Sequence, residues 1–512
     1  MPMNMNQTST RLLKMQYWKR NSIIQNGINA GYSYRSFLWN RLFQLYSFFI
    51  VLFLVLNGFK LSAQAQLKFS VSDQVIISSS HMPFWLWANQ DGRIDPGASF
   101  LNLTDISADG AAFLMKDHQL RFDYGVTTTT GIEHENYLQV NRLFGGLDYK
   151  GWRINVGKYY DPKQLEGLST TNGNLARSRN FRPYPRIGLS TDGFKSVPFA
   201  RHWLGFRLEY DEGMLNDKRY VMHAHLHHKA FYFQVKPAND WAIQAGMEHF
   251  VMWGGTSRNT QIGDLPDDFI SYLRYISGSP GSNDFPTTDQ LNVAGNQYGT
   301  YQLKIIKDAE KYSLTFYLSH PFEDLSGVNW RNYPDNLLGV HFHLNNPDAF
   351  LSDFLYEFTD TRQQSISDSL YSWDATGQRW YRNLVDNYYS NSVYRSGVTY
   401  HQMAMCSPLI APVLISNGMS LGFGSNRLVS HHIGLKGRIL HELYWKTLLT
   451  ATRYLGTYSQ PYRPEKKQLS GLVEFNYINE KLPFDLRFSI AADAGSFYED
   501  ALGVQCSISK EW

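Results

Sequence analysis

The chain has 512 residues, of which 43% are hydrophobic, 15% aromatic and 18% charged, and this balance excludes both a helical membrane bundle and a disordered chain. The two cysteines, Cys406 and Cys506, exclude a disulfide scaffold. The formal charge of +3 arises from seven basic residues among residues 1–65, which contain no acidic residue. Because acidic residues outnumber basic ones in the remainder, a nucleic-acid partner has no electrostatic support.

The N-terminal region has the layout of a secretion signal. Residues 45–56 read LYSFFIVLFLVL, follow Arg35 and Arg41, and precede Ala63-Gln64-Ala65. A basic region, an apolar run and a small-x-small site in this order predict a signal peptide cleaved after Ala65. The apolar run is shorter than the roughly 20 residues of a spanning helix. We therefore predict an N-terminal extension and signal peptide over 1–65 and an exported domain over 66–512.

The exported region alternates apolar and polar residues in short segments. Residues 484–493 read FDLRFSIAAD, and the last segment alternates similarly before ending at Trp512. Such alternation is typical of strands with two different faces, as in a soluble sandwich or a membrane barrel. The signal peptide, the aromatic content and Trp512 favour the barrel. We predict an all-β fold, a large antiparallel transmembrane β-barrel of about 16–18 strands with short helical elements in its connections.

Three regions interrupt this pattern. Within 263–281, apolar residues at helical spacing lie between Pro266 and Gly278, which predicts a short helix near 266–277. Residues 345–387 are polar and predict a long external loop with another short helix. Residues 92–117 look too irregular for a simple hairpin.

A histidine-rich segment, MHAHLHHK, contains His223, His225, His227 and His228. Spacing of two residues on a strand places the first three imidazoles on one face, roughly 7 Å apart, which is too far for one metal ion. We therefore predict histidines that line the lumen, with the face of Leu226 against lipid, and no metal site.

Arginines and a tryptophan form the candidate binding residues. Arg177, Arg179, Arg182 and Arg186 lie within ten residues, and their guanidinium groups can bind an acidic polysaccharide or a lipid phosphate, or pair with acidic residues of neighbouring strands. In FVMWGGTSR, Trp253 can stack on a sugar ring or lie at the membrane interface.

The chain has no GxSxG, HExxH or P-loop lysine motif. We predict no catalytic residues, no cofactor and no metal, and hence no enzyme.

Several segments together resemble the Wzi-type capsule assembly proteins of Gram-negative outer membranes. They are HMPFWLWANQDGR at 81–93, WRINVGKYYD at 152–161, LSTTNGNLARSRNFRPYPRIGL at 168–189, VPF at 197–199, LHHKAFYFQV at 226–235, HFVMWGGTS at 249–257, LPDDFISYLR at 265–274, GNQYGTYQLK at 295–304, DNYYSNSVYRSGVTYH at 386–401 and SNRLVSHHIGLKGR at 425–438. The chain departs from the expected pattern at 403–409, where Cys406 stands in place of a glycine.

The resemblance implies an occluded outer-membrane barrel of about 18 strands with a small periplasmic helical element. It also implies a lectin that attaches exported capsular or other surface polysaccharide to the cell. From side-chain chemistry and position in the matched segments, we predict polysaccharide contacts at Arg177, Arg179, Arg182, Trp253, Arg258 and Arg427. The predicted partners are polysaccharide and outer-membrane lipid, and the protein is expected to be a monomer. The alternatives are a porin-like channel for small solutes and an outer-membrane lipid-modifying enzyme.

Overall fold

The computed structural model describes residues 66–512, except 116–118, 134–135, 201–202, 367–370, 374–378, 382–384 and 480. The predicted signal peptide lies outside the described residues.

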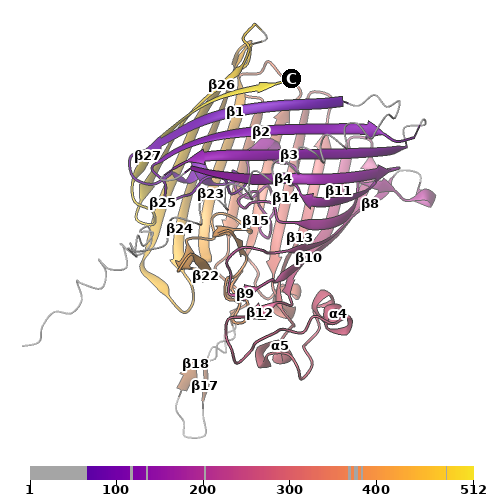
Figure 1. Cartoon of the computed structure of the whole chain (residues 1–512), viewed down its shortest axis with the longest axis vertical. Helices are drawn as coiled ribbons and strands as arrows, with labels where there is room; N and C mark the ends of the chain where they lie inside the picture. Colours follow the sequence, from indigo (N-terminus) through magenta and orange to yellow (C-terminus); the bar gives the residue numbers. More distant parts are fainter. Residues whose placement is uncertain are drawn as a thin grey trace, which may run out of the picture.

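Eighteen antiparallel strands form a closed barrel in which each strand pairs with its neighbours in chain order (Figure 1). Pairing of β1 with β27 closes the ring, with Val75 opposite Cys506. The strands are β1 (Gln66–Ser78), β2 (Phe100–Phe113), β3 (Leu120–Ile132), β4 (Asn136–Tyr149), β5 (Trp152–Lys158), β6 (Arg186–Thr191), β8 (Leu204–Met214), β10 (His225–Ala238), β11 (Trp241–Trp253), β13 (Asn296–Asp308), β14 (Tyr312–Phe322), β15 (Asn336–Leu344), β16 (Asp353–Asp360), β23 (Arg427–Leu440), β24 (Leu443–Gly456), β25 (Pro461–Tyr477), β26 (Asp485–Gly495) and β27 (Ala501–Glu511). Short β7 (Lys195–Ser196) also pairs with β8. The predicted barrel is confirmed.

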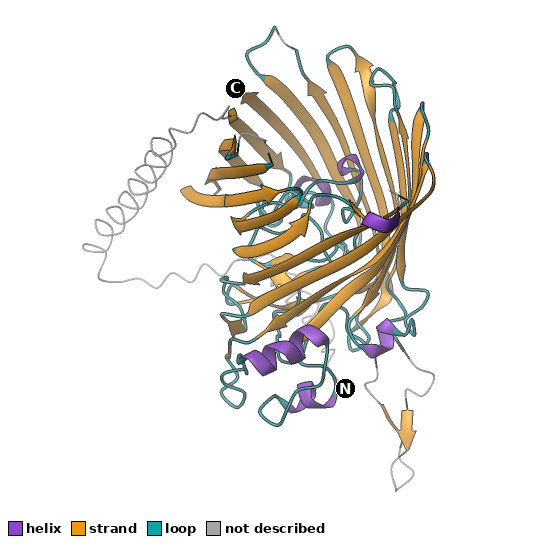
Figure 2. Ribbon diagram, turned by 90° about the vertical axis from the view of Figure 1, so that its right-hand side faces the viewer, coloured by secondary structure: helices purple, strands orange, loops and turns teal. Residues whose placement is uncertain are grey.

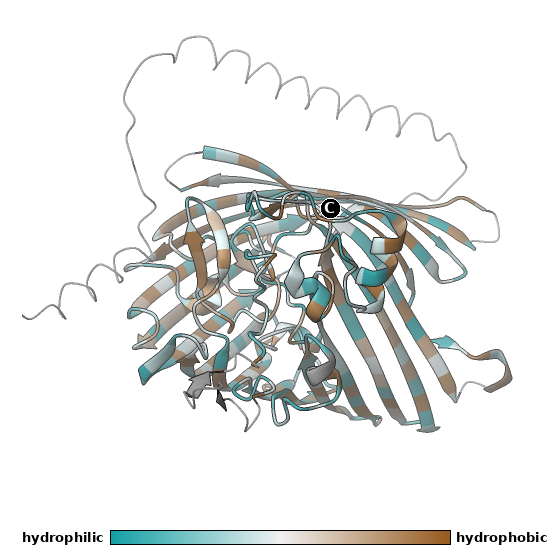
Figure 3. Cartoon of the chain, turned by 90° about the horizontal axis from the view of Figure 1, so that it is seen from below, coloured by the Kyte–Doolittle hydropathy of each residue, from teal (hydrophilic) through white to brown (hydrophobic). Residues whose placement is uncertain are grey.

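The strands alternate an exposed apolar face with a buried polar face. On β26, Phe488 and Ile490 are exposed, whereas Ser489 and Asp493 are buried. Figure 3 shows this alternation along the wall. The exposed apolar side chains of the wall, which we call the apolar band, include Leu143, Ile154, Ile187, Phe231, Phe233, Leu303, Phe316, Leu338, Ile433, Leu449, Leu469, Ile490 and Leu502. An outward apolar band around a polar interior is the surface pattern of a barrel in lipid.

The two ends of the barrel differ in the length of their connections. At the end that holds Gln66 and Trp512, many connections are short, such as 150–151, 239–240 and 441–442. At the opposite end the connections include 79–99, 159–185, 254–295 and 361–426. The second end is here called the mouth. In outer-membrane barrels the end with the longer loops is the extracellular one.

The connections contain short helices and small sheets. The helices are α3 (Phe84–Trp87), α4 (Phe269–Ser277), α5 (Thr287–Leu291) and α6 (Leu325–Val328), with 3-10 turns at Leu165–Gly167 and Pro198–Ala200. The sheets pair β9 (Val221–Met222) with β12 (Thr256–Ser257), β17 (Tyr371–Trp373) with β18 (Arg379–Tyr381), β19 (Thr399–Tyr400) with β20 (Met403–Ala404), and β21 (Val413–Ser416) with β22 (Met419–Phe423). None of the helices among the described residues is long and apolar enough to cross a membrane.

Helix α4 confirms the helix predicted near 266–277. Asp268 caps its N-terminus by accepting hydrogen bonds from the amides of Ile270 and Ser271, at 2.9 and 3.2 Å. Gly278 ends it with a φ of 67°, a conformation that glycine adopts without strain. The helix lies at the mouth, so it does not belong to the periplasmic element that the resemblance implies.

Three connections fold into the lumen, residues 79–99, 159–185 and 385–426. Figure 2 shows loops and short helices inside the barrel wall. Their apolar side chains, among them Phe84, Leu168, Tyr184 and Tyr388, form a buried core inside the wall. The indole nitrogen of Trp85 donates to Thr450 Oγ1 of the wall at 3.1 Å. The lumen is therefore occupied by the chain itself, as the resemblance implies.

Two predictions about irregular regions are wrong. The long loop predicted over 345–387 contains barrel strand β16, and no helix lies in its described part. The irregular region 92–117 contains the 14-residue strand β2. In β2, Ala108, Gly110 and Ala112 occupy positions where larger apolar residues would have made the alternation visible.

Candidate functional site

The segment 159–185, here called the plug, crosses the lumen and attaches to the opposite wall. Glu357 of β16 accepts hydrogen bonds from the Ser169 hydroxyl at 2.5 Å and from the amide and hydroxyl of Thr170 at 2.8 and 2.7 Å. The Leu168 carbonyl lies 2.7 Å from Nε2 of His432 on β23. Because these wall groups are buried, the plug supplies the hydrogen bonds that they would otherwise lose.

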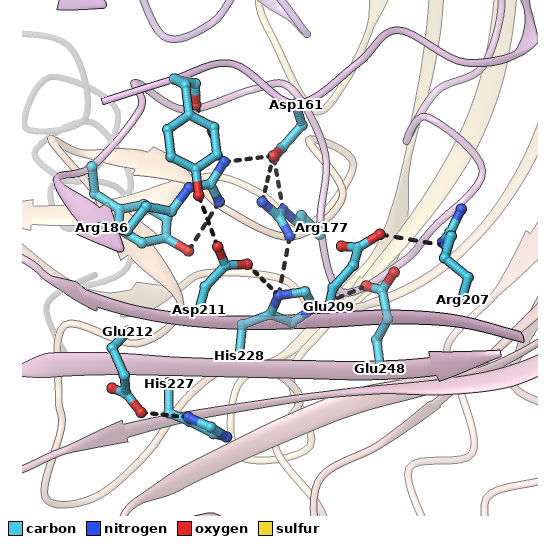
Figure 4. A network of polar contacts seen from close by, with 12 residues as sticks. Asp161, Arg177, Arg186, Arg207, Glu209, Asp211, Glu212, His227, His228 and Glu248 are labelled. Carbon is cyan, nitrogen blue, oxygen red and sulfur yellow. Dashed lines mark hydrogen bonds and ion pairs between the residues drawn. The ribbon is translucent and has the colours of Figure 1, made fainter. Parts of the chain in front are cut away.

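Two of the four arginines in the cluster share one carboxylate (Figure 4). Asp161 accepts from Nε of Arg177 at 2.7 Å and from Nη2 of Arg186 at 2.8 Å. Burial raises the pKa of Asp161, but the two guanidinium groups outweigh it and lower that pKa to about 2. Asp161 is therefore ionised at neutral pH and holds both arginines.

The network continues onto the lumen face of the wall. Asp211 Oδ1 accepts the Tyr159 hydroxyl at 2.9 Å, and Asp211 Oδ2 lies 2.8 Å from Nδ1 of His228. Nη1 of Arg177 lies 3.4 Å from the same imidazole nitrogen. Acidic and basic side chains thus alternate from the plug into β8 and β10. The sequence predicted such pairing with acidic residues of neighbouring strands as the alternative to ligand binding by the arginines.

Arg179 and Arg182 attach the plug to the 79–99 connection. Arg179 pairs with both carboxylate oxygens of Asp91, at 2.8 and 2.6 Å. Nε of Arg182 donates to the Gly92 carbonyl at 3.0 Å. Arg177 and Arg179 thus hold carboxylates of the chain itself, and their contact with polysaccharide remains a prediction.

A polar cavity of about 270 Å³ lies between these segments and the wall. It is lined by Ser70, Ser72, Asp91, Arg93, Asp105, Ser107, Thr127, Arg142 and Tyr160. Arg93 pairs with Asp105, and Arg142 donates to Asp109 at 2.5 Å. The sequence interpretation missed these residues, although Arg93 and Tyr160 lie within segments 81–93 and 152–161, which resemble the family.

Arginines stacked on tyrosines lie at the mouth. The Arg427 guanidinium carbon is 3.8 Å from the Tyr458 ring centroid, and that of Arg395 is 5.0 Å from the Tyr220 ring centroid. Arg258 reaches the same neighbourhood, since its amide donates to the Tyr220 carbonyl at 3.1 Å. Within the described part of the chain, these three arginines form no ion pair with a carboxylate.

The predicted site residues therefore lie in separate places. Arg177, Arg179 and Arg182 lie in the plug, whereas Arg258 and Arg427 lie at the mouth. Trp253 lies on the outer face of β11, with its ring centroid 5.0 Å from that of Tyr272 in α4. This is the position expected of a tryptophan near the membrane interface.

The histidine prediction is wrong about the face. Leu226 and His228 face the lumen, whereas His225 and His227 share the outer face with Phe231. Nδ1 of His227 lies 2.6 Å from Glu212, which is also on the outer face (Figure 4). His223 precedes β10 in a left-handed conformation with φ of 56°. The regular alternation expected from residue 223 therefore begins only at His225.

Neither cysteine forms a disulfide, since Cys406 is buried in the lumen core and Cys506 is exposed on the outer face. Among the described residues, no group of three or more His, Cys, Asp or Glu side chains can hold a metal ion.

A closed barrel with an outward apolar band and a lumen filled by its own segments defines a β-barrel of the outer-membrane type. The chain belongs to the capsule assembly protein Wzi family, whose model matches residues 58–409.

Comparison with the solved structure of Wzi gives the same fold. Wzi of Escherichia coli, an outer membrane protein involved in group 1 capsule assembly and a carbohydrate-binding β-barrel, is 14% identical and has a TM-score of 0.54, with 86% of this chain and 83% of Wzi covered. OccK5 of Pseudomonas aeruginosa is 10% identical with a TM-score of 0.45, and 87% and 97% of the chains are covered. OpdQ of the same organism is 9% identical with a TM-score of 0.44, and 88% and 99% are covered. A comparison with curated proteins gave no match.

Proposed function

We propose that the protein is a non-enzymatic, monomeric outer-membrane barrel that binds capsular or other surface polysaccharide at its mouth and attaches it to the cell. Membership of the Wzi family and the carbohydrate binding of Escherichia coli Wzi support this function. The proposal includes export by a cleaved signal peptide over residues 1–65.

The observation that carries the proposal is that arginines of the lumen form ion pairs within the chain, whereas three arginines of the mouth form none with the described residues. In the lumen, Arg177 and Arg179 hold carboxylates of the chain. At the mouth, Arg258, Arg395 and Arg427 form no ion pair with a carboxylate of the described residues, and the last two are stacked on tyrosine rings. Guanidinium groups bind the carboxylates of acidic sugars, and an aromatic ring stacks on the apolar face of a sugar.

This contrast divides the six predicted contact residues by role. Arg258 and Arg427 contact the glycan directly. Arg177, Arg179 and Arg182 hold the plug and the 79–99 connection in place, and Trp253 packs beneath α4. Binding at each mouth site is weak, and attachment results from many polymer repeats near one surface.

Binding of the purified, detergent-refolded barrel to a panel of capsular and lipopolysaccharide glycans tests the proposal, with conductance of the same preparation recorded in planar bilayers. Selective glycan binding without conductance supports it. Conductance without glycan binding contradicts it and establishes the porin-like alternative.

A deletion strain provides the test in the cell. Loss of attached capsule while export continues is expected, and normal capsule retention would contradict the proposal. Altered membrane lipid in that strain, restored by the wild-type gene, would instead support the lipid-modifying alternative.

A further inference from the structure

Helix α4 lies against the outer wall of the barrel at the mouth. Its Tyr272 hydroxyl donates to Glu212 of β8 at 2.5 Å and also contacts the Tyr210 hydroxyl. Its Tyr275 packs in a small buried core with Val251 of β11. Glu212, Tyr210 and Val251 all lie on the face of the wall that carries the apolar band, because their side chains alternate with inward ones.

The opposite face of α4 is apolar and exposed. Phe269 is 72% exposed, Ile270 67% and Leu273 44%, whereas Ser271 and Tyr275 are buried against the wall. At 100° per residue, the three exposed side chains form one stripe that points away from the barrel. Close by in the chain, Leu291 at the end of α5 is 83% exposed.

The C-terminal end of α4 lies close to the apolar band. Lys229 of β10 donates through Nζ to the Ile276 carbonyl at the C-terminal end of α4. Phe231 and Phe233, two and four residues further along the same face of β10, are exposed members of the band. At about 3.3 Å per residue, Phe231 lies only about 7 Å along the strand from the helix contact. Figure 1 shows α4 at the mouth, below β10 in that view.

Aromatic side chains also lie on the outer face of the barrel near the mouth at the neighbouring strands β13 and β14. Trp330 stacks on His320 of β14 with 3.9 Å between ring centroids, and His320 lies beside Tyr301 of β13. Tryptophan and tyrosine concentrate where a barrel passes from acyl chains to headgroups. This part of the wall therefore marks the boundary between the acyl chains and the headgroups of the outer leaflet.

We propose that α4 is an interfacial helix whose stripe of Phe269, Ile270 and Leu273 inserts into the acyl chains of the surrounding outer leaflet. Its occupant is membrane lipid, because α4 packs on the face of the wall that carries the apolar band and its exposed stripe points away from the protein. An amphipathic helix in this position holds the 254–295 connection, which also carries Arg258, at a constant height above the bilayer. The proposal does not depend on polysaccharide binding.

Spin labels in a nanodisc of phosphatidylethanolamine and phosphatidylglycerol test the proposal. One label is placed at Leu273→Cys in a Cys506→Ser background and compared with Asn283→Cys, an exposed polar position of the same connection. Native Cys506, exposed on the wall, provides the lipid-facing reference. Relaxation by oxygen, which partitions into lipid, is compared with relaxation by a water-soluble nickel chelate.

The ratio of oxygen to nickel relaxation at Leu273→Cys is expected to approach that of Cys506 and to exceed that of Asn283→Cys several-fold. Equal ratios at Leu273→Cys and Asn283→Cys would overturn the proposal. A heat-modifiable gel shift verifies that each labelled variant is a folded barrel. Ile270→Cys gives an independent measurement on the same stripe if Leu273→Cys does not fold.

Discussion

The carboxylate of Glu357 on β16 holds Thr170 of the plug at two points, accepting from its amide at 2.8 Å and from its hydroxyl at 2.7 Å. The Tyr317 hydroxyl donates to the same carboxylate at 2.7 Å. One buried side chain of the wall thus fixes the segment that fills the lumen.

Glu357→Ala is expected to loosen the plug, because the Ser169 and Thr170 donors lose their acceptor. Conductance steps in planar bilayers should appear or become more frequent than in the wild type. The matched control is Glu474→Ala, which removes a buried wall carboxylate that pairs with Lys446. Equal conductance of the two variants would contradict a specific attachment of the plug by Glu357.

Asp161→Asn leaves Arg177 and Arg186 without their shared carboxylate. Breaking a buried pair in this way costs about 3–5 kcal/mol, so the free energy of unfolding should fall by about that amount. Urea unfolding in detergent measures it. Asp348→Asn, which removes an exposed partner of Arg438, should change stability by less than about 0.5 kcal/mol.

The carboxylate of Asp161 also predicts how the stability of the protein changes at acid pH. Because the pKa of Asp161 is lowered to about 2 in the folded state, its stabilising contribution is complete above about pH 4. That contribution is lost as the pH falls from about 4 through 2. Wild-type stability should decline over this range, and Asp161→Asn should decline less. An equal decline in both proteins would show that other groups cause it.

The arginines of the mouth and those of the plug should differ in their response to salt. The double variant Arg258→Ala/Arg427→Ala should weaken binding of an anionic glycan more at low salt than at high salt, because salt screens the wild-type attraction. The matched control, Lys311→Ala/Lys481→Ala, removes two exposed charges at the opposite end of the barrel and should leave binding unchanged.

Arg177→Ala/Arg179→Ala should weaken glycan retention equally at low and high salt, because these arginines pair with Asp161 and Asp91. Isothermal titration at two salt concentrations measures both effects. A salt-dependent loss in this variant would place the glycan in the lumen.

Asp335 predicts a change of stability with pH whose direction is opposite to that predicted from Asp161. Burial raises its pKa to about 7, although the amides of Gln363 and Gln364 donate to its carboxylate at 2.8 and 2.7 Å. The folded state therefore binds the extra proton, and stability falls as the pH rises from about 4 to about 7. Hydrogen-exchange protection of these two amides, corrected for intrinsic rates, should decrease over that range.

Asp335→Asn provides the control for this pH dependence. Because the amide side chain does not titrate, protection of Gln363 and Gln364 should be lower at acid pH and nearly constant between pH 4 and 7. A variant that retains the wild-type pH dependence would assign it to another group, such as Glu323, whose pKa burial also raises.

Much of the fold follows from local patterns. Alternation over 485–511 predicted two-faced strands, because side chains on a strand point in opposite directions at successive residues. Helix α4 was predictable because Pro266, the apolar spacing and Gly278 act within one short segment. Strand β2 was missed because small residues carry no period-two signal.

The site depended on contacts that no local pattern contains. The chemistry of Arg177 and Arg179 indicated anion binding, but their anions proved to be Asp161 and Asp91, and Asp91 is distant in the sequence. Family resemblance identified the segments that contain Arg93 and Tyr160 without indicating that they line a cavity.

The sequence by itself determined the class of fold and the family, because alternation, helix boundaries and segments that resemble a family are properties of short stretches. Only the tertiary structure decided which face of β10 is the outer one. His227 is buried there because Glu212 comes from a neighbouring strand and Tyr272 comes from α4. In a strand with a period of two, either set of alternate residues can face outward. Near the mouth, other segments of the protein cover the outer wall, so the polarity of the side chains does not show which set does.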